Sequence, residues 1–355
     1  MRRLIVVEAR GGEAFVAALR RAWDAGDAVL PLDPRLPPPA REAVLAAARP
    51  DEPVEEGDAV VVATSGTTGE PKAAVLTHDA VAASAWATSA RLAVDPENDR
   101  WLACLPLAHV GGLSVVTRAL VTRTPLTVHD GFSAPAVAAA AAEGATLVSL
   151  VPTALRRVDP AAFRTVVLGG SAMPPDLPAN AVTTYGMTET GSGVVYDGTP
   201  LDGVDLRVVD GEIQVRAPML LRCYREGRDP RTPDGWYPTG DAGEWDAAAG
   251  RLTVHGRQGT LIITGGENVW PAAVERVLAA HPSVAEVAVV GRPDPEWGQR
   301  VVALVVPADP ASPPGLAALR SLVRESLPAY AAPREVQVVA SLPRTASGKV
   351  ALWRL

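Results

Sequence analysis

Short apolar runs rich in β-branched residues alternate with alanine-rich stretches over the first two thirds of the chain. The alternation of strand and helix patterns with short connections predicts a parallel α/β sheet. The β-branched runs predict strands over Val60–Ala63, Trp101–Leu105, Leu126–His129, Leu147–Val151 and Thr165–Leu168. The stretches between them predict helices over His78–Arg91, Leu113–Thr122, Ala134–Ala142 and Pro152–Val158.

The pattern changes near Leu201, where short strands are separated by glycine-centred turns and predict a small antiparallel β subdomain. Its expected strands are Val204–Val209, Glu212–Arg216 and Arg251–His255. A last α+β unit is expected to contain a helix opening at Pro271, strands at Val284–Val290 and Val301–Val306, a helix at Leu316–Ser326 and a strand at Glu335–Val339. We therefore predict an α/β domain over residues 1–257 and a small, mobile α+β domain over 258–355.

The composition of the chain excludes several classes of function. Of 355 residues, 48% are hydrophobic and 21% charged, which is typical of a globular protein, and the net charge of −7 argues against a nucleic-acid partner. Cys104 and Cys223 form no CxxC pair, which argues against a disulfide scaffold or a cysteine-based zinc site and fits a reducing compartment. The apolar run in MRRLIVVEARGGEAF is too short for a signal peptide, and the stretch 134–151 is too alanine-rich to span a bilayer. We expect a cytoplasmic protein without membrane insertion.

Lysine is nearly absent from this chain. Of its 33 basic residues, only Lys72 and Lys349 are lysines, a bias that a GC-rich genome would explain. Both lie in loops rich in Gly, Pro, Ser and Thr. A site that needs a compact ammonium group cannot accept a planar guanidinium, so both lysines are candidate functional residues.

The segment TSGTTGEPK, which follows the apolar run VVVA, is the sharpest local signal. Its hydroxyls, glycines and lysine can wrap a polyphosphate, because glycine lets backbone N–H groups approach closely. It differs from a Walker loop, since Pro71-Lys72-Ala73 replaces Gly-Lys-Ser/Thr. The alternative is an ordinary polar turn before a helix. The candidate phosphate ligands here are Thr64, Ser65, Gly66, Thr67, Thr68, Gly69 and Lys72.

Seven ordered segments resemble the motifs of the acyl-adenylate-forming superfamily, which includes acyl- and aryl-CoA synthetases, nonribosomal-peptide adenylation domains and luciferases. They are TSGTTGEPK (64–72, phosphate loop), LPLAHVGGL (105–113, acyl pocket), LGGSAM (168–173, adenine), YGMTET (185–190, phosphate and magnesium), WYPTGD (236–241, ribose), GRQGTLIITGGENVWPAAVE (256–275, hinge and following loop) and PRTASGK (343–349, catalytic lysine). The chain is identified as a member of this superfamily because chance does not explain seven matches in order.

The resemblance implies a site for ATP and Mg²⁺. Glu189 is the implied magnesium ligand and Thr188 lies near the α-phosphate, while a solvated helix-start acid is the alternative for Glu189. Asp241 is expected to accept hydrogen bonds from the ribose, unless it only caps a turn, and Arg257 to contact the ribose or phosphates. Tyr185 either stacks near adenine or belongs to the core. The remaining implied nucleotide-binding residues are Gly169, Gly170, Ser171, Gly186 and Met187.

The segment LPLAHVGGLSVVTRALV is similar to that of o-succinylbenzoyl-CoA synthetases, the ligases of menaquinone biosynthesis. The resemblance implies that Arg118 binds the second carboxylate of a dicarboxylic acid, with Gly112 in the acyl pocket and His109 as a gate or orienting group. On a helical wheel Arg118 falls opposite an apolar stripe, so a solvated arginine is the alternative. A lone histidine is also often structural.

The predicted reaction is a two-step ligation through an acyl-adenylate to a coenzyme A thioester, with Lys349 as the catalytic lysine of adenylation. Gly265, Gly266 and Glu267 are the expected coenzyme A contacts. The alternatives are another aryl- or acyl-CoA ligase, an enzyme that loads a carrier-protein phosphopantetheine, or an inactive nucleotide-binding module. The sequence leaves the oligomeric state open.

Two segments depart from the superfamily pattern. AVLPLDPRLP (28–37) lies close to the N-terminus, which predicts a reduced N-terminal subdomain. Gly259 stands where relatives often carry an acidic residue or lysine at the hinge, so the pivot of the expected domain rotation stays open.

Overall fold

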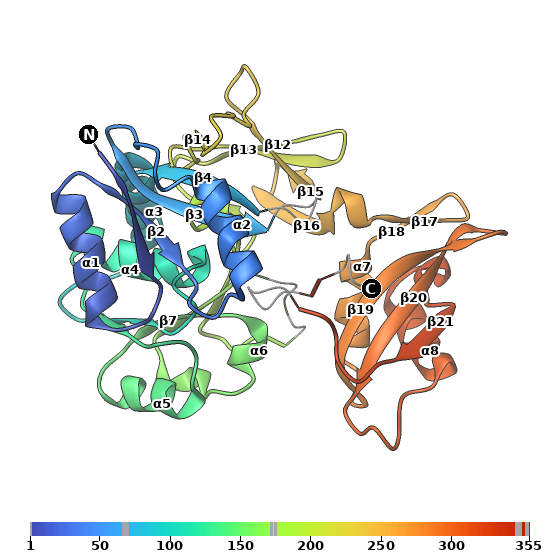
Figure 1. Ribbon diagram of the computed structural model, residues 1–355. Helices are drawn as coiled ribbons and strands as arrows, with labels where there is room; N and C mark the ends of the chain where they lie inside the picture. The colour runs from blue at the N-terminus through green and yellow to red at the C-terminus, as the bar shows by residue number, and fades with distance from the viewer. Residues whose placement is uncertain (1, 66–70, 171–172, 174–175, 345–349, 352–354) are drawn as a thin grey trace.

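The computed structural model describes residues 2–65, 71–170, 173, 176–344, 350–351 and 355. Its first sheet has the strand order β1-β2-β3-β4-β14 (Figure 1). Strands β1 to β3 are parallel, whereas β4 runs antiparallel to both β3 and β14. The strands are β1 (Leu4–Glu8), β2 (Ala28–Leu32), β3 (Asp58–Ser65), β4 (Pro71–Thr77) and β14 (Cys223–Tyr224).

Strand β4 corrects one expectation from the sequence. The phosphate-loop segment follows a strand that is parallel to its neighbour β2, as predicted. Lys72, however, was expected in a loop and lies on β4, which pairs antiparallel with β3 and places Lys72 opposite Thr64. The run AAVL inside β4 is buried at all four positions, so the sheet buries more apolar surface by continuing than by ending at β3. Helix α3 (His78–Arg91) begins only after β4, and its N-cap Thr77 accepts a hydrogen bond from the Ala80 N–H at 3.1 Å.

The second sheet has the order β11-β10-β9-β8-β7-β5-β6, and its strands from β9 to β6 are parallel, which confirms the predicted parallel α/β sheet. Strands β10 and β11 are antiparallel additions at one edge. Its strands are β5 (Trp101–Ala103), β6 (Leu126–Val128), β7 (Leu147–Leu150), β8 (Thr165–Leu168), β9 (Ala181–Gly186), β10 (Gly193–Tyr196) and β11 (Thr199–Pro200). The connecting elements are α4 (Val110–Thr122), α5 (Ala134–Ala142), α6 (Pro152–Leu155) and the 3-10 turns η1 (Pro160–Ala162) and η2 (Thr188–Thr190).

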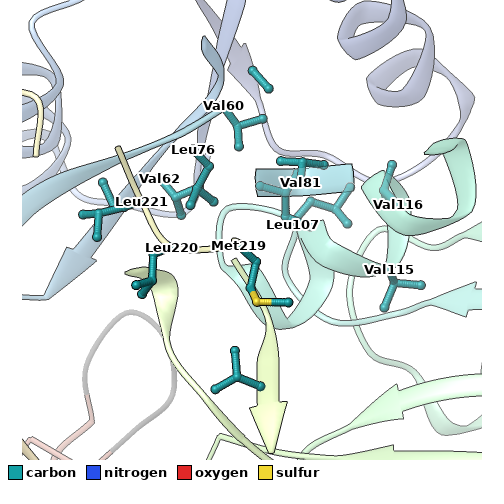
Figure 2. Close-up of a cluster of buried hydrophobic side chains, with 14 of the residues drawn as sticks. Val60, Val62, Leu76, Val81, Leu107, Val115, Val116, Met219, Leu220 and Leu221 are labelled. Atoms are coloured by element: carbon teal, nitrogen blue, oxygen red, sulfur yellow. The ribbon is translucent and has the colours of Figure 1, made fainter. Parts of the chain in front are cut away.

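Helix α3 contacts strands of both sheets, α4 contacts α3 and the second sheet, and residues of both helices belong to the main core. Figure 2 shows this cluster, which includes Val60 and Leu76 of the first sheet, Val81 of α3 and Val116 of α4. Helices α1 (Glu13–Asp24) and α2 (Pro38–Ala48) also pack on the first sheet, and α1 buries Phe15, Leu19 and Ala22 on one face. None of the described helices is long and apolar enough to cross a membrane.

The predicted antiparallel β subdomain is present as the sheet β12-β13-β15-β16. Its strands are β12 (Asp205–Val209), β13 (Glu212–Arg216), β15 (Tyr237–Asp246) and β16 (Arg251–Arg257). The short strand β14, which lies between β13 and β15 in the sequence, instead joins the first sheet. This crossing of the chain ties the β subdomain to the phosphate-loop hairpin.

The last unit follows the turn η3 (Gln258–Thr260) and stands apart from the other sheets in Figure 1. It forms a five-stranded sheet with its own apolar core, covered by two helices that contact each other. Its elements are β17 (Ile262–Thr264), β18 (Glu267–Val269), α7 (Pro271–Leu278), β19 (Val284–Asp294), β20 (Gly298–Pro307), α8 (Leu316–Ser326), η4 (Ala329–Ala331) and β21 (Glu335–Val338). The boundary between 257 and 258 and the mobility of this unit stay predictions.

A buried carboxylate links the loops at one end of the parallel sheet. Asp99 accepts two hydrogen bonds from Arg164, at 2.9 and 2.7 Å, and further bonds from the Thr146 hydroxyl and the Asp95 N–H. Burial opposes ionisation of Asp99, but the bonds from Arg164, Asp95 and Thr146 outweigh it and lower its pKa. Four donors on one carboxylate therefore hold together the ends of several strands.

We expect Asp99→Asn to lower the free energy of unfolding by roughly 1.5–3 kcal/mol, because hydrogen bonds to a charged group are lost. Since the folded-state pKa is depressed, this stability is present above the unfolded value of about 4 and is lost as the pH falls through the lower folded value. Urea unfolding of both proteins between pH 3 and 7 measures the difference. The control Asp205→Asn removes an exposed ion pair with Arg216 and should cost under about 1 kcal/mol. Equal losses in the two variants would contradict the prediction.

Candidate active site

Residues from six of the seven predicted motifs lie where the second sheet meets the β subdomain and strands β3 and β4. Thr64 and Ser65 end β3, and Lys72 lies on β4 beside them. Gly66, Thr67, Thr68, Gly69, Ser171 and Lys349 lie outside the described residues. Lys72 places its ammonium 5.5 Å from the centre of the Tyr224 ring. The phosphate-loop lysine thus lies next to a residue that sequence reasoning did not select.

The glycines of the predicted adenine segment allow close packing at the ends of β8 and β9. A Cβ on Gly169 would lie 2.6 Å from the Thr184 hydroxyl, which donates to the Leu168 carbonyl. Gly170 has a φ of +86°, a region that favours glycine. Gly186 lies even closer to its neighbours, because a Cβ there would be 2.1 Å from the Ser192 carbonyl. The ends of strands β8 and β9 can therefore present backbone groups at the carboxyl edge of the sheet.

Asp241 is the centre of a hydrogen-bonded group between β9 and the β subdomain. The Tyr185 hydroxyl donates to its Oδ2 at 2.8 Å, and the Arg257 Nε lies 3.0 Å from its Oδ1. Arg257 also donates to the Thr239 carbonyl at 2.8 Å. Burial, then the charge of Asp241, raise the pKa of Tyr185, so its phenol stays a donor at neutral pH.

Glu189 is a buried carboxylate in the turn η2. The Tyr224 hydroxyl donates to its Oε1 at 2.7 Å, and its carbonyl accepts from the Leu221 N–H at 2.7 Å. The alternative of a solvated acid at a helix start is wrong, because Glu189 is only 8% exposed. Thr188 precedes it in the same turn, and Met187 is the N-cap of that turn.

Arg118 is buried inside α4, so the solvated-arginine alternative is also wrong. It is 2% exposed, its Nη2 donates to the Ser192 hydroxyl at 3.0 Å, and its guanidinium lies 4.9 Å from the Trp101 ring centre. Among the described residues its Nε and Nη1 have no hydrogen-bond partner. Burial lowers its pKa, as expected for a cation without a carboxylate beside it.

A cavity connects Arg118 with the turn that carries Glu189. It lies between α3, α4 and strands β3 and β4, and its wall includes Arg118, Ser114, Thr117, Val60 and Gly191. Gly191 follows η2 directly, so one cavity reaches both the buried guanidinium and the predicted phosphate motif. His109 stands at the N-cap of α4, and the buried Gly112 packs so closely that a Cβ would be 2.4 Å from the Leu105 carbonyl.

The remaining predicted contacts belong to the last unit. Gly265 and Gly266, with φ of +61° and +82°, form the turn of the β17–β18 hairpin, and Glu267 opens β18. All three are exposed. Glycine is favoured at both central positions of this turn because both have a positive φ.

Comparison with known proteins explains this arrangement. Residues 46–225, about half of the chain, match the family model of AMP-binding enzymes, and residues 273–349 match that of the AMP-binding enzyme C-terminal domain. A Mycobacterium tuberculosis protein named probable 2-succinylbenzoate–CoA ligase is 40% identical over 99% of this chain and 96% of its own length. The chain belongs to the AMP-binding enzyme family.

Solved structures of similar AMP-binding enzymes share the fold. The o-succinylbenzoate CoA synthetase of Bacillus subtilis, in complex with the acyl-adenylate intermediate, has a TM-score of 0.86 and 28% identity over 99% of this chain and 87% of that one. The same Bacillus enzyme in complex with ATP and magnesium has a TM-score of 0.87 at 28% identity, covering 99% and 89%. The predicted α/β fold with a small C-terminal unit is confirmed.

The donor set of this AMP-binding enzyme fits a magnesium ion that arrives with ATP. The described residues contain no group of three or more His, Cys, Asp or Glu side chains that could hold a metal alone. Mg²⁺ keeps several waters and commonly uses one or two carboxylates plus substrate phosphates, and the single buried carboxylate of Glu189 supplies such a ligand.

Two residues of the site escaped sequence reasoning. Ser192 receives the hydrogen bond from Arg118, and Tyr224 donates to Glu189. Ser192 lies just beyond the YGMTET motif, so extending the motif by two residues would have included it. No local signal marks Tyr224, because its role depends on a strand that pairs with β4 far away in the sequence.

Proposed function

We propose that this enzyme activates 2-succinylbenzoate with ATP and transfers the acyl group to coenzyme A, in menaquinone biosynthesis. Relatives bearing that activity in their names match nearly the whole chain, and a similar solved enzyme holds the corresponding acyl-adenylate. The structural observation that carries the proposal is Arg118, a buried guanidinium with two unpaired nitrogen atoms among the described residues, which lines a small cavity that also borders Gly191, directly after the phosphate motif.

The charge of Arg118 argues for a substrate with a second carboxylate. An unpaired buried cation costs several kcal/mol, and a fatty acid would leave that cost uncompensated. A dicarboxylic acid presents one carboxylate for activation and the other to the guanidinium, which binds carboxylates in bidentate fashion. The hydroxyls of Ser114 and Thr117 in the same cavity add polar partners for the acid.

We assign the nucleotide to the edge shared by β3, β9 and the β subdomain. Thr64, Ser65 and Lys72, with the loop between them, would bind the phosphates, and Asp241 would accept from the ribose while Tyr185 and Arg257 hold it in place. Tyr185 then acts by orienting Asp241, a role that differs from stacking on adenine. Gly169, Gly170, Gly186, Met187 and Thr188 would supply backbone and hydroxyl contacts.

The chemistry proceeds in two balanced steps. A carboxylate oxygen attacks the α-phosphorus of ATP, the bond to the bridging oxygen breaks, and pyrophosphate leaves. The thiolate of coenzyme A then attacks the acyl carbon and AMP leaves. Magnesium, when bound, neutralises charge on the phosphates, and Glu189 would hold it. The protein's own part is to orient the two anions and supply cations where charge develops.

The C-terminal unit would serve both steps in turn. Lys349 would bridge the carboxylate and the phosphates during adenylation, and Gly265, Gly266 and Glu267 would contact coenzyme A after the unit rotates. His109, at the N-cap of α4, would orient the acyl group. We place the reaction in the cytoplasm, where ATP and coenzyme A are available and the buried thiols of Cys104 and Cys223 stay reduced.

A carrier-protein phosphopantetheine is the competing acceptor. Pyrophosphate release with 2-succinylbenzoate and ATP, followed by thioester formation with coenzyme A or a phosphopantetheinylated carrier protein, distinguishes the two. Thioester with the carrier protein alone would overturn coenzyme A as acceptor, and no pyrophosphate release with 2-succinylbenzoate would overturn the acid.

Arg118→Leu should raise KM for 2-succinylbenzoate roughly 10–150-fold and leave KM for ATP nearly unchanged, since a charge-assisted bidentate contact contributes about 1.5–3 kcal/mol. The melting temperature should not fall, because the variant removes a buried unpaired charge. Steady-state kinetics and thermal unfolding measure both, with the exposed Arg20→Leu on α1 as control. An unchanged KM for the acid would disprove the carboxylate assignment.

Glu189→Gln should depress adenylation and raise the magnesium concentration required for half-maximal rate, while the fold is retained. The amide keeps the volume and an acceptor for Tyr224 but loses the charge that a hard cation prefers. Pyrophosphate release across a magnesium titration measures this effect. Normal activity with normal metal dependence would make Glu189 a structural residue.

Lys349→Ala should lower acyl-adenylate formation by several orders of magnitude, because its ammonium acts as charge develops between the carboxylate and ATP. The variant should still convert supplied acyl-adenylate and coenzyme A to thioester at a near-normal rate. Single-turnover assays of each half-reaction test this division. Equal loss in both half-reactions, or in neither, would contradict it.

A further inference from the structure

Tyr224 joins the predicted metal ligand to the phosphate-loop hairpin. Its ring is 4% exposed, and its hydroxyl donates to Glu189 Oε1 at 2.7 Å. In the part of the chain that the structure describes, no donor contacts Oε2. One oxygen of the buried carboxylate is therefore held by the protein, and the other keeps its lone pairs for a ligand.

The backbone around Tyr224 is anchored from both sides. On β14, Tyr224 pairs with Ala74 of β4, two residues after Lys72. Three residues earlier, the Leu221 N–H donates to the carbonyl of Glu189. The same short segment thus binds the hairpin that carries the phosphate-loop lysine and the turn that carries the carboxylate, which fixes the donor relative to both.

The Tyr224 ring lies against two cations. The Lys72 ammonium is 5.5 Å and the Arg228 guanidinium 4.6 Å from its centre. Such cation–π contacts favour one position of the ring. A second hydroxyl, that of Tyr237, lies 3.5 Å from the Tyr224 hydroxyl.

The phenol is a donor throughout the neutral range. Burial, followed by the negative charge of Glu189, raises the pKa of Tyr224 to about 12.

We propose that Tyr224 is a positioning residue for the metal site, holding Glu189 by Oε1 so that Oε2 can bind Mg²⁺ carried by ATP. The inference rests on the proposed role of Glu189. Partners that orient a metal-binding carboxylate typically change metal affinity 10- to 100-fold when removed. A tyrosine that only fills the core would affect stability and leave metal affinity unchanged.

The test measures ATP binding by isothermal titration calorimetry, once with Mg²⁺ and once with EDTA, without acid or coenzyme A. In Tyr224→Phe the ring and its cation contacts remain, so the affinity for ATP in EDTA should stay within about twofold of the parent. Its affinity for MgATP should fall roughly tenfold. Tyr196→Phe is the matched control, since it removes another buried tyrosine hydroxyl, bonded to Thr88, in the same core.

Glu189→Gln separates failure of this inference from failure of the proposed function. If Glu189→Gln leaves magnesium-dependent binding unchanged, the metal assignment itself is wrong. If Glu189→Gln weakens MgATP binding and Tyr224→Phe does not, or if Tyr224→Phe weakens ATP equally in EDTA, the positioning role of Tyr224 is overturned. In the Glu189→Gln background, Tyr224→Phe should add little.

If Tyr224→Phe does not fold, two tyrosine analogues incorporated at position 224 can test the proposal instead. 4-Aminophenylalanine restores a donor and should recover MgATP binding, whereas 4-methylphenylalanine fills the same volume without a donor and should not. Equal MgATP binding by the two analogues would overturn the proposal.

Discussion

The cost of burying charge governs this site. An ion removed from water loses several kcal/mol of solvation unless partners replace that solvation. On the nucleotide side the chain meets this requirement, because Asp241 lies between Arg257 and Tyr185, and Glu189 receives the Tyr224 hydroxyl. Arg118 is different, since among the described residues it has one hydroxyl partner and no carboxylate. The carboxylates of the proposed nucleotide site therefore have protein partners, whereas in the proposed acid site the substrate would supply the missing carboxylate partner of Arg118.

Strand pairing brings these groups together. The register of β15 with β16 places Asp241 opposite Arg257, and that of β3 with β4 places Thr64 opposite Lys72. Strand β14 then joins the first sheet through β4, so a segment after β13 contributes to both the hairpin and the turn at Glu189. Backbone hydrogen bonds therefore set distances between side chains that lie over a hundred residues apart in the sequence.

The sequence predicted what local patterns encode. Helix α3 and helix α5 have the predicted bounds. Helix α3 begins after the N-cap Thr77, α5 carries Pro135 in its first turn, and both helices are rich in alanine. Strand β4 was missed because its polar entry segment resembled a turn, and burial on both faces replaced the alternation that marks a strand.

The family motifs contain most of the candidate site residues, whereas the position of Tyr224 depends on long-range strand pairing that no single sequence window contains. The burial of Arg118 was equally hidden, since the helical wheel placed it opposite the apolar stripe and α4 is enclosed on all sides but its ends.

That enclosure explains why an arginine is tolerated in the core at all. Every residue of α4 from Gly112 to Ala119 is buried, so its polar side chains lie inside the protein, and Ser114, Thr117 and Arg118 line one cavity. The Trp101 ring and the Ser192 hydroxyl offset part of the cost of the guanidinium. Under the proposed function, a second carboxylate of the substrate would relieve the remaining cost on binding, and the same charge would discriminate against acids that lack one. The free energy of folding lost to the buried guanidinium would then be the source of substrate specificity.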